Sequence, residues 1–198
     1  MDAGYRLSAA VLLISSVCVS AYYYRRAGRT RPVIYDAQEG HALATLRILW
    51  ISAAMGGVVV YVVYPPRVAL GQLPLPDAVR LLGIIPAIGH VALLTWAHRA
   101  LGDNFSTSLH IGREHQLVTS GPYRWIRHPL YVAGLLAFVA WGLLSANALI
   151  GALGIGFGLF IMFVRTPREE RMLEDTFGAT YRDYMARTGR FLPRLPRS

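Results

Sequence analysis

Apolar residues gather in five stretches along the chain, and polar residues gather between them. The stretches cover residues 5–24, 42–64, 79–97, 130–145 and 147–164. A helix needs about 20 residues to cross the hydrocarbon core of a bilayer, so the first three stretches are long enough to span it. The last two are shorter, and only Ser145, Ala146 and Asn147 separate them. This pattern predicts an all-α membrane protein with five transmembrane helices, of which the last two form a tight helical hairpin.

Composition supports a membrane protein over a soluble one. Of the 198 residues, 54% are hydrophobic, and the mean hydropathy is +0.38. The net charge of +9, carried by arginines alone, suits a bilayer with anionic headgroups. The apolar stretches leave no soluble basic domain, so we expect no nucleic-acid partner. The one cysteine, Cys18, lies inside the first stretch, which excludes disulfide and thiolate–metal scaffolds, and we predict no metal site.

The arginine positions predict how the helices are oriented. Arg6 alone precedes the first apolar stretch, whereas Arg25 and Arg26 follow it directly. The positive-inside rule therefore places the N-terminus outside and the C-terminus in the cytoplasm. With this topology Arg6, Arg67 and Arg80 lie on or near the outer side, and the other 17 arginines lie on the inner side. We expect a multi-pass integral membrane protein, in the inner, cytoplasmic membrane if the source is bacterial.

The polar tail after the hairpin predicts cytosolic helices. Thr166 is expected to cap a helix, with Pro167 in its first turn and Glu169 completing a capping box. Gly178 is expected to end this helix, and Thr180 to cap a second one. One face of these helices is expected to be apolar and to pack against the membrane helices. It consists of Leu173, Phe177, Tyr181 and Tyr184.

Helix packing explains two other features of the apolar stretches. Gly154 and Gly158 form a small-xxx-small pair, which is typical of closely packed membrane helices. His90 lies within the third stretch. We interpret it as a histidine that packs between helices rather than as a ligand.

Short polar motifs collect on the two inner segments that flank the hairpin. The first reads HQLVTSGPYRWIRHPLYVAG over residues 115–134, and the second reads FVRTPREERMLEDTFGATYRDYMARTGRFLP over residues 163–193. A His-x-Leu-Val, a Gly-x-Tyr and an Arg-His-Pro-x-Tyr precede the hairpin. An Arg and then Glu-Glu-x-x-Leu-x-x-x-Phe-Gly-x-x-Tyr-x-x-Tyr follow it. This ordered set resembles the isoprenylcysteine carboxyl methyltransferase family of integral membrane enzymes, close to its compact prokaryotic members.

The resemblance implies S-adenosylmethionine as cofactor and S-adenosylhomocysteine as product, enclosed between the hairpin and the C-terminal helices at the cytosolic membrane surface. It assigns Arg165 to the substrate carboxylate, and Arg165 with Glu169 to the catalytic centre. The residues that it assigns to cofactor binding are His110, His115, Gln116, Leu117, Val118, Tyr123, His128, Pro129, Leu130, Tyr131 and Glu169. We expect one domain over residues 1–198, with three N-terminal spans in 1–101 and a cofactor-binding catalytic region in 102–198.

The activity that the resemblance implies is carboxyl O-methylation of a prenylcysteine-like or other lipophilic carboxylate, either a small molecule or a lipidated one. A carboxylate is already charged, so the transfer needs no catalytic base, and the fork of Arg165 can hold both carboxylate oxygens. His128 and Tyr131 are expected to line the cofactor cavity, while Arg127 faces the headgroups.

Three other functions remain open at the level of the sequence. The chain could be a phospholipid N-methyltransferase, or a methyltransferase of small lipophilic thiols or amines. It could also be a small membrane scaffold or a transporter-like subunit without enzymatic activity. Arg165 favours an anionic acceptor over an amine, so carboxyl methylation is the leading interpretation.

Overall fold

A computed structural model describes residues 2–26, 41–102 and 117–194, and in these ranges the protein is built from helices. Its elements are α1 (Asp2–Arg26), α2 (His41–Val63), η1 (Pro65–Val68), α3 (Asp77–Leu81), α4 (Ile84–Leu101), η3 (Gly121–Arg124), α5 (Pro129–Ser145), α6 (Ala148–Phe160), the π-helix η4 (Ile161–Arg165), α7 (Thr166–Phe177) and α8 (Ala179–Arg187). No β-strand forms within the described ranges. The predicted all-helical class is confirmed.

Four helical runs in the described part of the chain are long and apolar enough to cross a membrane. They are Asp2–Arg26, His41–Val63, Asp77–Leu101 and Ala148–Phe177. The remaining apolar helix, α5, has 17 residues, fewer than the about 20 that a perpendicular span requires. All five predicted apolar stretches are therefore helical, and the protein has the character of an integral membrane protein. The count of five spans and the orientation of the termini stay predictions.

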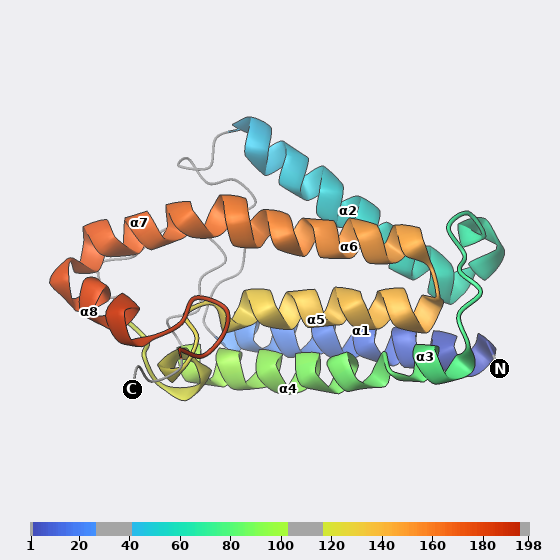
Figure 1. Ribbon diagram of the computed structural model, residues 1–198, viewed down its shortest axis with the longest axis horizontal. Helices are drawn as coiled ribbons and strands as arrows, with labels where there is room; N and C mark the ends of the chain where they lie inside the picture. The colour runs from blue at the N-terminus through green and yellow to red at the C-terminus, as the bar shows by residue number, and fades with distance from the viewer. Residues whose placement is uncertain (1, 27–40, 103–116, 195–198) are drawn as a thin grey trace.

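The helices form a bundle, and the elements that carry the polar motifs gather at one of its ends. Figure 1 shows α1, α4, α5 and the continuous α6–α7 helix running alongside one another, with α2 crossing α6 obliquely. The short helices α7 and α8 lie together at the end of the bundle where α5 begins. The loop before α5 and the chain after α8 thus lie at the same end of the bundle. These segments contain polar motifs that were identified from the sequence.

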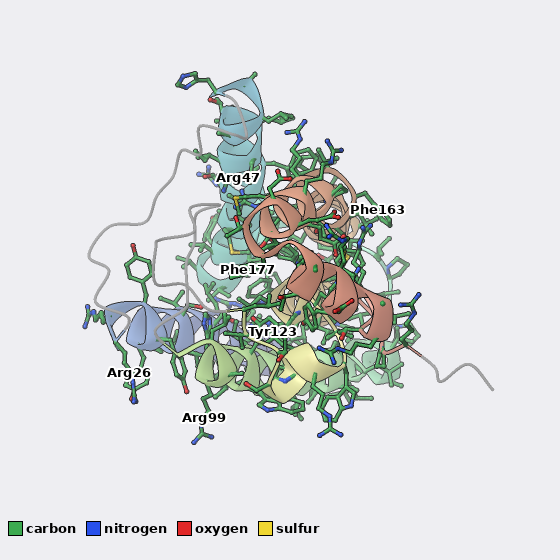
Figure 2. The ribbon with its side chains drawn as sticks, turned by 90° about the vertical axis from the view of Figure 1, so that its left-hand side faces the viewer. Arg26, Arg47, Arg99, Tyr123, Phe163 and Phe177 are labelled. Carbon is green, nitrogen blue, oxygen red and sulfur yellow. The ribbon has the colours of Figure 1, made fainter. Side chains whose placement is uncertain are left out.

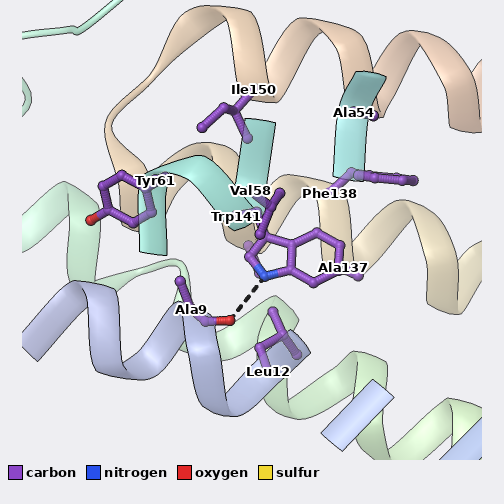
Figure 3. Packing of buried hydrophobic residues seen from close by; sticks show 10 residues of the cluster. Ala9, Leu12, Ala54, Val58, Tyr61, Ala137, Phe138, Trp141 and Ile150 are labelled. Carbon is purple, nitrogen blue, oxygen red and sulfur yellow. Dashed lines mark hydrogen bonds between the residues drawn. The ribbon is translucent and has the colours of Figure 1, made fainter. Parts of the chain in front are cut away.

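The packed centre of the bundle surrounds Trp141 of α5. Its indole N–H donates to the carbonyl of Ala9 in α1 at 3.2 Å, which satisfies a polar group that would be costly to bury alone (Figure 3). Val58 of α2 and Ile150 of α6 pack into the same cluster. Helices α1, α2, α5 and α6 therefore meet at Trp141, and the segment before α5 leads into the end that carries the polar motifs.

The predicted hairpin forms as a tight turn with a polar cap. Ala146 has a left-handed backbone with φ of 48°, and Asn147 begins the next helix. The Asn147 side chain accepts from the N–H groups of Leu149 and Ile150 at 3.0 and 3.1 Å, and it donates to the carbonyl of Val68 at 2.6 Å. These bonds satisfy free backbone groups at the start of α6 and join it to η1.

Glycines allow α5 and α6 to pack closely. A Cβ at Gly154 would lie 2.7 Å from Phe138 Cβ, and a Cβ at Gly158 would lie 2.9 Å from Leu135 Cδ1. Both distances are shorter than ordinary carbon contacts, so a larger residue would force Phe138 to move at Gly154 and the end of the Leu135 side chain to move at Gly158. The predicted packing role of this pair is confirmed.

His90 connects three helices, as the sequence predicted for a packing histidine. Its Nδ1 lies 2.8 Å from the carbonyl oxygen of Ala133 in α5. Its Nε2 lies 2.7 Å from the hydroxyl oxygen of Ser16 in α1. Both ring nitrogens are therefore used in helix–helix contacts.

The expected helix cap at Thr166 is wrong, because the helix that starts at Ala148 continues through this residue. Thr166 has helical φ and ψ of −54° and −43°, is fully buried, and donates its hydroxyl to the carbonyl of Ile161 at 3.1 Å. Pro167 has no N–H and its ring crowds the carbonyl four residues earlier. The π-helical turn η4 directly before it widens the backbone there, so the helix passes the proline without ending.

Gly178 ends α7 as predicted, with a positive φ of 54°. The turn to the next helix is only this one residue, since α8 begins at Ala179. Thr180 therefore lies inside α8, and the expectation that it caps this helix is wrong. Tyr181 and Tyr184 of α8 are buried, as the apolar face of the tail predicted.

Candidate active site

The loop before α5 and the chain after α8 pair through their backbones. The N–H of Arg127 donates to the carbonyl of Gly189 at 2.9 Å, and that of His128 donates to the carbonyl of Arg190 at 3.2 Å. In the opposite direction, the N–H of Gly189 donates to the carbonyl of Trp125 at 3.1 Å. Pro129 then starts α5, a position where its missing N–H costs nothing. This pairing fixes the direction in which the Arg-His-Pro turn presents its side chains.

Tyr131 joins two predicted site residues from the far side of the hairpin. Its hydroxyl donates to Oε2 of Glu169 at 2.5 Å. The Nε of Arg165 donates to the same hydroxyl oxygen at 3.4 Å. The continuous helix through η4 and α7 places Arg165 and Glu169 one turn apart on the same face, so both reach the single tyrosine.

His128 lies between two carboxylates and against an aromatic ring. Its side chain is 5% exposed, with Nε2 3.2 Å from Oε1 of Glu170 and Nδ1 4.0 Å from Oε2 of Glu169. Its ring stacks on Tyr131, with 5.5 Å between the centroids and 3° between the planes. Because an ionised carboxylate only accepts, the proton of the first contact belongs to Nε2 of the histidine. Glu170 thereby fixes the orientation of the imidazole.

Glu170 is the buried anion on which the loop and the tail converge. It accepts from Arg127 Nε at 2.8 Å, from Arg190 Nη2 and from His128. Burial by itself raises the pKa of a carboxyl group, but the hydrogen bonds from these three residues outweigh it and lower the pKa of Glu170 to about 2. The residue lies in α7, where charged side chains replace the apolar run of α6. Its carboxylate therefore remains charged in the folded protein.

The expectation that Arg127 faces the headgroups is wrong. Its side chain is 10% exposed and also donates to the carbonyls of Met185 and Thr188 at the end of α8. A guanidinium has five donors in a fixed plane, and here a buried carboxylate and two free helix carbonyls accept them. Arg127 therefore binds the tail to the loop.

Tyr123 of η3 closes the side of the cluster next to α8. The Tyr184 hydroxyl donates to the Tyr123 carbonyl at 2.6 Å, and Figure 2 shows Tyr123 between α8 and the end of α4. Burial, with the Glu169 carboxylate close by, raises the pKa of Tyr123 well above its ordinary value. Its phenol therefore stays protonated and can donate a hydrogen bond.

Most of the predicted site residues that lie within the described ranges come together in the structure. The residues that converge at the start of α5 are Tyr123, His128, Pro129, Tyr131, Arg165 and Glu169. Leu130 is half-buried on the first turn of α5, and Leu117 with Val118 is half-buried in the segment that leads to η3. His110, His115 and Gln116 lie outside the described residues. Within the described ranges, His, Cys, Asp and Glu form no group that could hold a metal ion.

Sequence reasoning missed Glu170, Arg190 and Phe191. Glu170 follows Glu169 directly and Arg127 precedes His128 directly, so the two adjacent pairs could have suggested a second contact between the same segments. Arg190 and Phe191 have no such local pattern, because their place depends on the path by which the tail returns to the loop. The Phe191 ring lies 5.8 Å from that of His128 and covers it from the side of the tail.

An apolar helical bundle that carries a cluster of charged and aromatic side chains at one end has the features of an integral membrane protein. The model of the isoprenylcysteine carboxyl methyltransferase (ICMT) family matches residues 81–175. The recognition made from the sequence is confirmed, and this chain carries the ICMT-family region over these residues.

Curated relatives match the chain in part. Cobalt-zinc-cadmium resistance protein CzcN of Cupriavidus metallidurans is 39% identical over 85 residues, which are 42% of this chain and 38% of that protein. Methanethiol S-methyltransferase 2 of Bradyrhizobium diazoefficiens is 41% identical over 73 residues, 37% of this chain and 27% of that protein. Protein-S-isoprenylcysteine O-methyltransferase B of Arabidopsis thaliana is 34% identical over 95 residues, 46% of this chain and 48% of that protein. The matches span less than half the length of each relative.

Proposed function

We propose that this protein transfers a methyl group from S-adenosylmethionine to the carboxylate of a lipophilic acceptor at the membrane surface. One observation carries the proposal: the Tyr131 hydroxyl links Arg165 and Glu169, so an anion-binding and a cation-binding group lie side by side. Methyl transfer from a sulfonium to a carboxylate brings together one cation and one anion, and this pair of residues suits both.

The residues near Glu169 fit a positively charged cofactor. The Glu169 side chain is 26% exposed, so a ligand can reach it, and the Tyr131 hydroxyl holds one of its oxygens in place. The stacked rings of His128 and Tyr131 add aromatic surface, which attracts cations. S-Adenosylmethionine, when bound, supplies a methyl group activated by a sulfonium charge. Glu169 and the two rings would bind and orient the charged part of the cofactor.

Arg165 would bind and position the acceptor. A carboxylate already carries the charge of the nucleophile, so the site needs no residue that removes a proton. The guanidinium keeps its charge at all relevant pH values and can hold two oxygens at fixed distance, which favours a productive alignment. Too tight a bond would reduce the reactivity of the oxygen, so we assign Arg165 to positioning the acceptor.

The surroundings of Arg165 favour a lipophilic acceptor. Phe163 and Val164 precede it directly and are 69% and 37% exposed on η4. In a bilayer these apolar side chains contact lipid rather than water, so Arg165 lies where an apolar surface meets a charged one. An acceptor with an apolar tail and an anionic head matches this boundary.

A thiolate is the second candidate acceptor. One matching relative is named methanethiol S-methyltransferase 2, a name that describes methyl transfer to sulfur. A thiolate is also an anion that Arg165 could bind. A thiol must first lose its proton, however, whereas a carboxylate need not. The carboxylate therefore remains our first choice.

Detergent-purified protein incubated with radiolabelled S-adenosylmethionine and a panel of acceptors tests the proposal. The panel contains prenylcysteines, phosphatidylethanolamine and small thiols. We expect label in the prenylcysteine methyl ester, no turnover in Arg165→Ala, and normal turnover in Arg171→Ala, which removes an exposed arginine of α7. Label in the thiol alone would replace the carboxylate by the second candidate, and label in phosphatidylethanolamine or in no acceptor would refute the proposal.

A further inference from the structure

An open, largely apolar groove runs between α1 and α4, and Leu144 in the last turn of α5 lines it as well. Its volume is about 860 Å³, in the upper part of the 300–1,000 Å³ range that is usual for ligand sites. Leu7 and Val11 of α1 form one wall, and Ile88 and Ala92 of α4 form the other. Leu7, Val11 and Ile88 are more than half exposed, so the groove opens to the surroundings of the bundle.

The groove has a basic and aromatic end. Trp96 and Arg99, in the last turns of α4, line it there, and Figure 2 shows Arg99 extending away from the bundle. The Trp96 ring lies 5.3 Å from that of Trp125, and the Arg124 guanidinium lies 5.3 Å from the centre of the Trp125 ring. Both tryptophans are more than two-fifths exposed. Exposed tryptophans beside arginines are typical of the headgroup level of a bilayer.

The length of the groove suits a lipid chain. Along α4 it extends from Ile84 to Arg99, which corresponds to about 22 Å at about 1.5 Å per residue. One leaflet of a bilayer contributes about 15 Å of hydrocarbon. A chain that begins at the level of Arg99 can therefore lie in the groove over the full depth of its leaflet.

We propose that the groove between α1 and α4 binds one anionic phospholipid, with its phosphate at Arg99 and an acyl chain against Val11, Ile88 and Ala92. Charge complementarity at one end and a largely apolar lining along the rest favour this ligand over a zwitterionic lipid. A second copy of this chain would place apolar side chains in the groove but would leave Arg99 without an anion. The proposed lipid site is independent of the methyl acceptor and of the site at Tyr131.

Native mass spectrometry tests this site on the full chain after reconstitution in vesicles of phosphatidylcholine and phosphatidylglycerol. Wild-type protein should retain one phosphatidylglycerol per chain in preference to phosphatidylcholine. Arg99→Gln should reduce this retention about fivefold, the factor expected for one arginine at an anionic surface. Ala92→Phe keeps the charge but fills the groove, and it should reduce retention as well. Arg67→Gln, at the other end of the bundle in η1, is the matched control and should retain the lipid.

Three results would overturn the lipid site. Equal retention of the two lipids by wild-type protein would show that no charge is recognised. Unchanged phosphatidylglycerol retention in both Arg99→Gln and Ala92→Phe would show that the lipid binds elsewhere. A lipid-free dimer that Ala92→Phe dissociates would show that a second copy fills the groove. Because Ala92 and Arg99 are exposed, both variants should unfold at the same temperature as wild type in detergent.

Discussion

Arg127 Nε lies 2.8 Å from Oε1 of Glu170, and this contact joins the loop before α5 to the helix that follows the hairpin. Both side chains are at most 10% exposed. The pair, together with His128 and Arg190, determines where the imidazole next to Tyr131 lies. The geometry of the candidate active site thus depends on this buried ion pair.

Removing the Glu170 carboxylate should therefore destabilise the protein strongly. Glu170→Ala leaves the buried charge of Arg127 without its partner, which typically costs about 3–5 kcal/mol of unfolding free energy. Glu174→Ala removes an acid of the same helix whose contact to Arg182 is largely exposed, and it should cost at most about 1 kcal/mol. Thermal unfolding of both variants in detergent measures the difference. Equal unfolding temperatures for the two variants would contradict this role.

The same carboxylate should make stability depend on pH in the acid range. The pKa of Glu170 is about 2 in the fold and 4.5 ordinarily, so its contribution is complete above pH 4.5 and is lost as the pH falls towards 2. The difference in stability between wild type and Glu170→Gln should be largest near neutral pH and shrink by roughly 3 kcal/mol over this window. Unfolding followed at several pH values would show it. A difference that stays constant from pH 6 to pH 2.5 would argue against a charged Glu170.

The close contact between α5 and α6 offers a test of packing. Gly154→Ala places a methyl group within 2.7 Å of Phe138 Cβ, so the helices must separate, at a cost of about 1–3 kcal/mol. Gly56→Ala in α2 adds the same methyl group where nothing lies within 4 Å, and its stability should be unchanged or slightly higher. Thermal unfolding in detergent compares the two, and a neutral Gly154→Ala would mean that the helices are further apart than described.

The hydroxyl of Tyr131 should matter for turnover. Tyr131→Phe removes the group that holds Glu169 and Arg165, each a charged partner. Hydrogen bonds to charged groups contribute about 1.5–3 kcal/mol, so kcat/KM should fall roughly 10- to 100-fold. Tyr64→Phe removes an exposed hydroxyl beyond the end of α2 and should leave kcat/KM unchanged. Methyl-transfer rates of both variants, measured with the acceptor found in the panel, test this prediction. Equal rates for the two variants would contradict it.

Much of the fold follows from local features of the sequence. The apolar stretches predict where the helices lie, and Ser145–Asn147 predicts the turn between the two helices of the hairpin. The spacing of Gly154 and Gly158 predicts the close contact between α5 and α6. The approach of His128 to Glu169 was predictable only through the family motif, since the residues are far apart in the chain. These features are local or belong to a fixed order of motifs, which explains why the sequence could reveal them.

The remainder depended on tertiary contacts. Thr166 and Pro167 carry the pattern of a helix start, but the buried setting and the π-helical turn before them keep the helix continuous. Arg127 carries the pattern of a headgroup residue, but the tail returns to the loop and brings Glu170 and two free carbonyls within reach. Rules for helix caps and for charged residues at membrane interfaces describe side chains in contact with water or lipid. Thr166 is buried and the Arg127 side chain is only 10% exposed, so these rules do not apply to them.

Binding of S-adenosylhomocysteine, measured by titration calorimetry on purified protein, tests the central claim most directly. We expect His128→Ala and Glu169→Ala each to weaken binding at least about tenfold, which corresponds to about 1.4 kcal/mol. Arg165→Ala should bind S-adenosylhomocysteine like wild type while it loses turnover, and Glu174→Ala should behave like wild type in both respects. Unchanged affinity in both His128→Ala and Glu169→Ala would contradict the account.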